Sequence, residues 1–76
     1  MFNKYNLSVR LYELRITKKI SQKELAEAVG VSYFTIGKIE LAQRAASIEL
    51  LYALADYFDV SLDYLVGRTD NPNVNR

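Results

Sequence analysis

The sequence predicts an all-α domain, a compact bundle of five short helices. Its apolar residues recur at intervals of three and four, rather than in the strict alternation that is typical of a strand. Serines precede four of these apolar stretches, where they can cap helix starts, and glycines follow two of them. With 76 residues, half of them hydrophobic, the chain has room for one domain with its own core.

The first two expected helices lie in the first thirty residues. The first covers about residues 7–18, because Leu7, Leu11 and Leu14 fall on one face of a helix. The second begins after Ser21, which can form a capping box with the glutamate three positions later. Gly30 supplies the left-handed residue that commonly ends a helix. These signals predict a second helix that is short and capped at both ends.

Three further helices are expected in the rest of the chain. Ser32 caps the third, which covers about residues 33–41. Ser61 caps a brief fifth helix that ends at Gly67. Ser47 caps the fourth helix, which has the widest apolar stripe, formed by Ile48, Leu51, Leu54, Ala55 and Phe58.

The chain divides into an expected folded domain, residues 1–67, and a polar, flexible tail, residues 68–76. Charge is also divided. Residues 1–44 contain eight basic and four acidic side chains, whereas residues 45–76 contain two basic and five acidic ones. A basic first half is suited to face the phosphates of nucleic acid, although ordinary scatter of surface charge explains the same counts.

The composition narrows the classes of function. The chain has no cysteine and no histidine, so disulfides, thiolate metal sites and the commonest catalytic groups are missing. We therefore expect neither an enzyme nor a metal or other cofactor. The sequence shows no membrane span and no signal peptide, so we expect a cytoplasmic protein associated with the nucleoid.

Residues 22–41 have the spacing of a helix-turn-helix. Two short helices that cross steeply need a small residue where they meet and a positive φ in the turn between them. Ala26 and Gly30 meet these needs, and the positions that face inward in such a motif are all apolar: Leu25, Val29, Val31, Ile36 and Ile39. This pattern is typical of DNA-binding motifs in which the second helix enters the major groove.

Residues 21–40, SQKELAEAVGVSYFTIGKIE, resemble the phage repressor and Cro-like (Xre-type) family of helix-turn-helix proteins. The same family's markers are matched by RLYELR at residues 10–15 and by SIELLYALADYFDVSLDYLVG at residues 47–67. The resemblance covers about residues 7–67. It implies a compact five-helix, repressor-like DNA-binding domain whose partner is double-stranded DNA.

The resemblance also implies roles for particular side chains. Gln22 matches the residue that holds a backbone phosphate at the start of the second helix, and Ser32 can add another phosphate contact. A structural salt bridge is implied between Arg15 and Glu40. The positions from which the family reads base edges are occupied by Tyr33, Phe34, Gly37 and Lys38.

The chain departs from the family after Glu40. The family usually has Asn-Gly-Lys there, whereas this chain has LAQRAA at residues 41–46. Without the customary glycine the third helix can continue farther, which leaves Gln43 and Arg44 as the candidates for the loop's phosphate contacts. At Gly37 the sequence leaves two readings open: a close approach of the backbone to DNA, or a silent position.

Several residues have a second interpretation. Tyr33 and Phe34 could belong to the core, but Ile36 and Ile39 already define the inner face, which favours contact with DNA. Lys38 could be an ordinary solvated lysine, but its place in the motif favours readout. A self-association surface is suggested by apolar residues off the main stripes, although Phe2 and Tyr5 could cover some of them: Leu50, Tyr52, Tyr57, Tyr64 and Val66.

The sequence therefore predicts a sequence-specific transcriptional regulator, expected to act as a repressor and to bind an inverted repeat as a homodimer. One alternative is an antitoxin or a DNA-targeting module of another protein, which would use the same reading helix. A contrasting alternative is a protein-interaction module that docks through Tyr33, Phe34 and Leu41.

Overall fold

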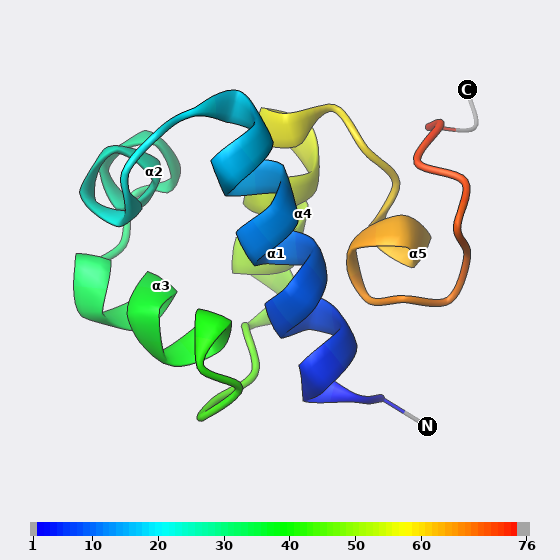
Figure 1. Ribbon diagram of the computed structural model, residues 1–76, viewed down its shortest axis with the longest axis horizontal. Helices are drawn as coiled ribbons and strands as arrows, with labels where there is room; N and C mark the ends of the chain where they lie inside the picture. Colours follow the sequence, from blue (N-terminus) through cyan, green and yellow to red (C-terminus); the bar gives the residue numbers. More distant parts are fainter. Residues whose placement is uncertain (1, 75–76) are drawn as a thin grey trace.

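The computed structural model describes residues 2–74 (Figure 1). These residues form five helices, joined by turns and loops, and no strand. They confirm the expected all-α class. The part described measures 29 × 24 × 22 Å. The helices are α1 (Lys4–Lys18), α2 (Gln22–Val29), α3 (Tyr33–Glu40), α4 (Ile48–Phe58) and α5 (Leu62–Leu65).

Helix α1 begins three residues earlier than the leucine pattern predicts. Asn3 caps its start, because the side-chain oxygen accepts a hydrogen bond from the backbone N–H of Tyr5 at 2.9 Å. Leu7 and Leu11 are fully buried on the inner face of this helix. The apolar pattern predicts that inner face, but it does not predict the first turn of α1, because the residues of that turn lie outside the core.

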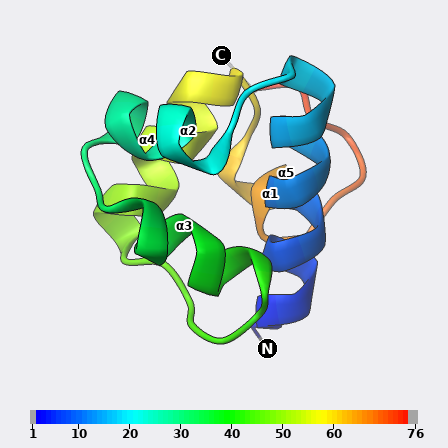
Figure 2. The ribbon, with the colours of Figure 1, turned by 60° about the vertical axis from the view of Figure 1, so that its left-hand side comes forward.

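The serine caps lie where the sequence predicts them. In α2 the hydroxyl of Ser21 accepts from the N–H of Glu24 at 3.0 Å, and the Glu24 carboxylate accepts from the N–H of Ser21 at 2.9 Å. Ser32 accepts from the N–H of Thr35 at the start of α3. Between them Gly30 has a φ of 77°, the left-handed conformation that turns the chain from α2 into α3. Helices α2 and α3 pack against each other (Figure 2).

The end of α3 corrects the expected boundary. The helix stops at Glu40 and does not continue into the following loop. Ala42 takes a left-handed φ of 58°, its N–H donates to the Ile39 carbonyl, and the N–H of Gln43 donates to the Lys38 carbonyl at 2.8 Å. This is a Schellman motif with alanine in the position where glycine is usual. A glycine is therefore not needed to end this helix.

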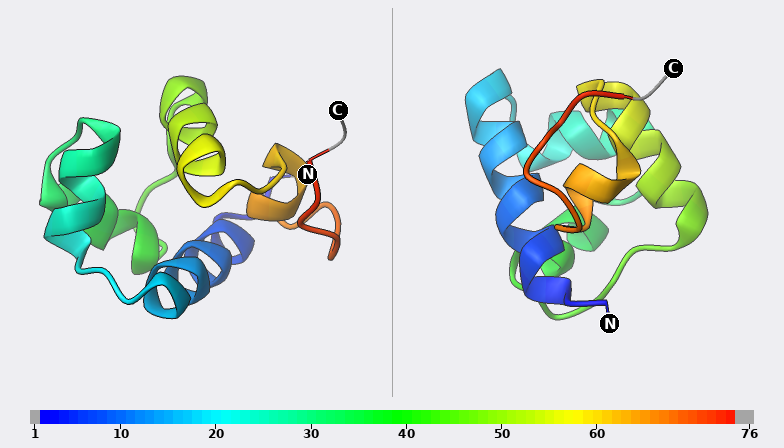
Figure 3. Two further views of the ribbon diagram at one scale, coloured as in Figure 1. Left: turned by 90° about the horizontal axis from the view of Figure 1, so that it is seen from above. Right: turned by 90° about the vertical axis from the view of Figure 1, so that its right-hand side faces the viewer.

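The core lies between α1, α2, α3 and α4, with α5 closing one end (Figures 1 and 3). One part of the expected core was wrong: Leu50 is buried, whereas Ile48 is 56% exposed. Ile48 is the first residue of α4 and lies at the edge of its inner face. The side chains that are fully buried are Leu7, Leu11, Leu25, Ile36, Ile39, Leu54 and Leu65.

The segment after α5 returns alongside the domain (Figure 3). The guanidinium of Arg10 donates to the Thr69 carbonyl at 3.2 Å and lies 2.7 Å from the Asp70 carboxylate, while the N–H of Ser61 donates to the Pro72 carbonyl. Asp70 is fully exposed, so its ion pair contributes little to stability. Residues 75–76 of the expected tail lie outside the described residues, and the division at residue 67 stays a prediction.

None of the helices within residues 2–74 combines the length and the apolar character that are needed to span a bilayer.

Candidate nucleic-acid interface

The outer face of α3 is exposed and its inner face is sealed. Tyr33 is 49% exposed and Phe34 is 66% exposed, whereas Ile36 and Ile39 are fully buried. The two aromatic rings lie against each other, with their centroids 4.5 Å apart. Lys38 is also exposed, one turn along the same face from Phe34. The aromatic pair is therefore not part of the core, and three side chains are presented to whatever α3 meets.

Ser32 performs a structural task at the start of α3. Its hydroxyl oxygen accepts from the N–H of Thr35 at 3.3 Å and lies 3.1 Å from the Thr35 hydroxyl. The residue is exposed, so the cap does not prevent an additional contact with an outside group. A phosphate contact at Ser32 stays a prediction.

Arg15 and Glu40 fix the end of α3 against α1. The Nε of Arg15 lies 2.6 Å from one carboxylate oxygen of Glu40, and its second guanidinium nitrogen donates to the other oxygen at 3.0 Å. Both side chains are nearly buried, being 11% and 5% exposed. The hydrogen bond from Arg15 to Glu40 raises the pKa of Arg15 above its ordinary value, against the opposing effect of burial, so the arginine stays charged.

Two more groups contact the Arg15–Glu40 pair, where the end of α3 meets α1; this junction is called the corner below. The Arg15 guanidinium also donates to the Ile20 carbonyl at 2.9 Å, which ties the pair to the turn between α1 and α2. The hydroxyl of Ser8, a buried residue of α1, donates to the backbone carbonyl of Glu40. Ser8 was missed in the sequence because a serine among leucines carries no signal of a contact 32 residues away. Together these bonds set the position of α3 relative to α1.

Gln22 is joined to this corner from α2. Its amide nitrogen donates to the Glu40 carboxylate at 3.1 Å. Its amide oxygen lies beside Gly37, at 3.6 Å from the point where a side chain of that residue would begin. Gln22 and Gly37, which the sequence treats as separate candidates, are therefore neighbours.

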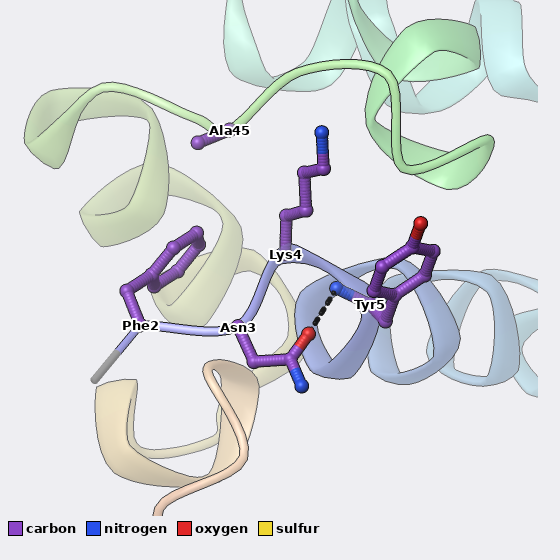
Figure 4. Close-up of a pocket in the computed structure, with 5 residues that line it drawn as sticks. All are labelled: Phe2, Asn3, Lys4, Tyr5 and Ala45. Carbon is purple, nitrogen blue, oxygen red and sulfur yellow. Dashed lines mark hydrogen bonds between the residues drawn. The ribbon is translucent and has the colours of Figure 1, made fainter.

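The loop after α3 carries the remaining predicted contacts. Gln43 and Arg44 are both exposed, and the Nε of Arg44 donates to the carbonyl of Ala45 at 3.3 Å. Next to this loop is a hollow of about 540 Å³, lined by Phe2, Asn3, Lys4, Tyr5 and Ala45 (Figure 4). Lys4 rises from the first turn of α1 toward the loop (Figure 4). It adds a basic group to the hollow beside Ala45 that no motif in the sequence indicated.

The expected self-association surface is only partly exposed. Tyr52 is 57% exposed on α4, but Leu50 is buried, which corrects its assignment to the surface. Tyr64 is covered by the Arg10 guanidinium, 3.9 Å above its ring, and Tyr57 packs edge-on against Phe58. Phe2 and Tyr5 are themselves 49% and 64% exposed. A further set of half-exposed apolar residues on α1 was not anticipated: Val9, Tyr12 and Ile16.

Comparison with known proteins identifies relatives of this arrangement. The sequence profile of the family described as Helix-turn-helix matches residues 11–65. The HTH-type transcriptional regulator YobD of Bacillus subtilis (strain 168) is 36% identical over 64 residues, which are 84% of this chain and 57% of YobD. The chain spans about half the length of the curated relatives that it matches.

Two solved structures have the same fold and similar length. The DNA-binding domain of the P22 C2 repressor superposes with a TM-score of 0.79 and 32% identity, covering 96% of this chain and 95% of that one. The restriction-modification controller protein C.AhdI of Aeromonas hydrophila superposes with a TM-score of 0.75 and 32% identity, covering 82% of this chain and 94% of the other.

Proposed function

Because the chain belongs to the Helix-turn-helix family, we propose that it is a sequence-specific DNA-binding regulator that reads the major groove with α3. The observation that carries the proposal is the contrast between the two faces of α3. Ile36 and Ile39 are fully buried, while Tyr33, Phe34 and Lys38 face outward on a helix that Arg15 and Glu40 hold at its end. A rigid helix with an exposed face is what major-groove recognition requires.

The exposed side chains are suited to different parts of DNA. Lys38 can donate to the O6 or N7 of guanine, and Phe34 can contact the methyl group of thymine. The hydroxyl of Tyr33 can reach a base edge or a phosphate. Phosphate contacts from Gln43 and Arg44 would come from the loop beyond α3, and Lys4 lies close enough to that loop to extend the same basic edge.

The regulator would act as a homodimer that represses by occupying a promoter at an inverted repeat. A domain of this size makes few contacts alone, and a twofold dimer places two reading helices about one DNA turn apart, roughly 34 Å. Tyr52 and Ile48, one turn apart on α4 and both more than half exposed, offer an apolar patch for association. Residues 1–67 would form this DNA-binding unit.

The proposal is tested by binding to duplexes selected from a random pool and measured at several salt concentrations. We expect a preferred sequence with twofold symmetry, and an affinity whose logarithm falls with log salt by about 0.9 per phosphate contacted. Lys38→Ala should relax selection at one position of each half-site, whereas Arg44→Ala should weaken all duplexes alike. Lys18→Ala is the control, because Lys18 lies over the ring of Tyr57, away from α3, and should change neither.

Two outcomes would count against the proposal. If no duplex is preferred over random DNA at low salt, sequence-specific binding is excluded. If binding is specific but sedimentation and the selected site show a single half-site, the dimer is excluded while DNA reading stands.

A second candidate is a protein-docking function through the same surface. It is favoured by Leu41, which is 69% exposed directly after the last residue of α3, so that apolar side chains are exposed at both ends of the helix, with Tyr33 and Phe34 at its start. In that case Leu41→Ser would abolish binding of the partner, and affinity would respond little to salt because charge contributes little.

A further inference from the structure

Four apolar residues lie in a line along the outer face of α1. Tyr5 is 64% exposed, Val9 56%, Tyr12 50% and Ile16 48%. Their spacing of four, three and four residues is that of positions a and d in a heptad repeat. Helix α1 packs against α3 and α5 and runs along the outside of the bundle (Figure 3). These four residues, called the α1 stripe below, form an apolar ridge to which another helix can pack.

Packing within the domain does not account for the α1 stripe. Leu7 and Leu11, on the inner face of the helix, are fully buried and complete its contribution to the core. A surface helix normally has polar residues opposite such a face. Helix α1 is apolar on both sides instead, and an exposed apolar patch of this kind marks a surface for interaction.

The α1 stripe is complementary to a second copy of itself in the antiparallel orientation. Rotation about a twofold axis between Val9 and Tyr12 would place Val9 opposite Tyr12 of the second copy. The same rotation would place Tyr5 opposite Ile16 of the second copy. Every contact along the pair would then join an aromatic ring to an aliphatic side chain, whereas a parallel pair would place each residue against its own equivalent.

The polar residues beside the stripe also favour this orientation. Asn6 and Glu13 are exposed and lie seven residues apart on the same flank. In an antiparallel pair Glu13 would come beside Asn6 of the second copy, whose amide can donate to the carboxylate. The start of each α1 would lie next to the end of the other, so that the two helix dipoles attract.

The size of the stripe sets the strength of such a pair. Its exposed surface amounts to about 400 Å² per copy, since an aromatic side chain covers about 150–250 Å² in full. The pair, with its polar flank, would cover about 1,000 Å² in total, at the lower limit for a specific interface. Association would therefore be weak between free copies and stronger between copies that are already held close together.

We infer that the α1 stripe is a self-association surface, which pairs in the antiparallel orientation with the α1 stripe of a second copy. The inference goes beyond DNA reading and does not rest on it. The surface belongs to a different helix from Ile48 and Tyr52, which are proposed to form the homodimer. Both surfaces can be occupied at once, which would link homodimers into a larger assembly.

Disulfide trapping tests which residues face each other. The chain contains no cysteine, so a thiol introduced on α1 is the only one in the protein. A Val9→Cys chain and a Tyr12→Cys chain are mixed and oxidised in a glutathione buffer. Random pairing would give twice as much disulfide between unlike chains as between either kind of like chains. The antiparallel pair predicts an excess of about tenfold, because only the unlike thiols lie opposite each other.

A second opposed pair keeps the test independent of Tyr12. The centre of the Tyr12 ring lies 5.6 Å from Cζ of Arg15, so its replacement changes the surroundings of the corner. Tyr5→Cys and Ile16→Cys avoid this and should show the same excess. Thr17→Cys, on an exposed residue of α1 outside the stripe, should form disulfides about tenfold more slowly.

Association without a cross-link is measured by sedimentation equilibrium. Val9→Lys places a charge between the two stripes and should weaken the association by at least about tenfold. Thr17→Lys is the matched control: it adds the same charge outside the stripe and should change the association by less than about twofold. Tyr52→Lys alters α4 and should leave the association that Val9→Lys removes. Thermal unfolding shows that each variant is folded.

The outcomes separate this inference from the proposed function. An excess of unlike disulfide, together with weaker association of Val9→Lys, supports the antiparallel pair. Disulfides in the proportions of random pairing, with association unchanged by Val9→Lys, overturn it and leave the α1 stripe to a helix of another protein. An excess of like disulfide also overturns it. None of these results alters the case for DNA reading, because every substitution lies outside α3.

Discussion

Helix α3 is bounded by two left-handed turns that reach the same geometry by different means. The turn before it contains Gly30, with a φ of 77°, and the turn after it contains Ala42, with a φ of 58°. Both close with the longer hydrogen bond of a Schellman motif: the N–H of Val31 donates to the Ala26 carbonyl, and that of Gln43 donates to the Lys38 carbonyl. Only one of the two uses the residue for which this conformation costs little.

The surroundings of the two turns explain the difference. A Cβ at Gly30 would meet no atom within 4 Å, so this position requires a backbone conformation and nothing from its neighbours. Ala42 is 8% exposed, so its methyl group is buried next to a corner that Arg15, Glu40 and Ser8 already hold. The first turn is specified by its own residue and the second by the tertiary structure around it.

The largest expected effect is at the corner that supports the second turn. Arg15→Ala should lower the free energy of unfolding by about 3 kcal/mol, because it leaves the nearly buried Glu40 carboxylate without its partner. Urea unfolding measures the change. Arg68→Ala, which removes an exposed pair whose atoms are 3.9 Å apart, is the control and should have no measurable effect. A loss at Arg15 as small as that at Arg68 would show that the corner does not hold α3.

The first turn should be sensitive to its own residue. Gly30→Ala should cost about 1 kcal/mol, from the left-handed backbone alone, since no atom obstructs the new methyl group. Gly67→Ala is the informative comparison. It has a similar φ of 85°, but there a Cβ would lie 2.6 Å from the Cβ of Asn6, so we expect a larger loss. Thermal unfolding measures both losses. Equal losses at the two glycines would show that the steric contact with Asn6 adds nothing to the cost of the left-handed backbone.

Between the two turns, Gly37 tests whether the helix itself is a weak point. Gly37→Ala should raise the free energy of unfolding by up to about 1 kcal/mol, because alanine loses less backbone entropy than glycine in a helix. The methyl group would lie at ordinary contact distance from Gln22. A midpoint of urea unfolding that falls instead of rising would show that position 37 does not tolerate a Cβ.

The smallest effect is expected at the second turn. Ala42→Gly relieves the left-handed strain, but it also removes a buried methyl group and loosens the unfolded chain. The relief of strain is worth about 1–2 kcal/mol and the two losses together about 1–2 kcal/mol, so the net change in unfolding free energy should stay within about 0.5 kcal/mol. A gain matching the loss at Gly30→Ala would mean that the two turns are equivalent after all.

The same contrast explains what the sequence could predict about the fold. Ser21, Ser32 and Ser47 mark helix starts because a cap is a local interaction between residues three apart. The end of α3 escaped prediction because nothing adjacent to Ala42 shows that its methyl group will be buried. Leu50 is buried and Ile48 is exposed, contrary to expectation, for a similar reason. The face of α4 that is covered depends on where the other helices lie.

The candidate site divides in the same way. The outward positions Tyr33, Phe34 and Lys38 follow from the periodicity of α3 once Ile36 and Ile39 are assigned to the core. The orientation of the Gln22 amide could not be predicted, because it depends on a carboxylate 18 residues away in the chain. Motif spacing identifies which residues lie near one another, whereas the direction of a hydrogen bond requires the three-dimensional arrangement.

The exposed aromatic pair also has an optical consequence. The chain contains no tryptophan, so light at the long-wavelength edge of the protein's absorption excites only tyrosine. Phe34 is 66% exposed on α3 and carries no polar group that a substitution would remove. A tryptophan at that position would be the single indole of the protein, and its emission would report directly on what the outer face of α3 touches.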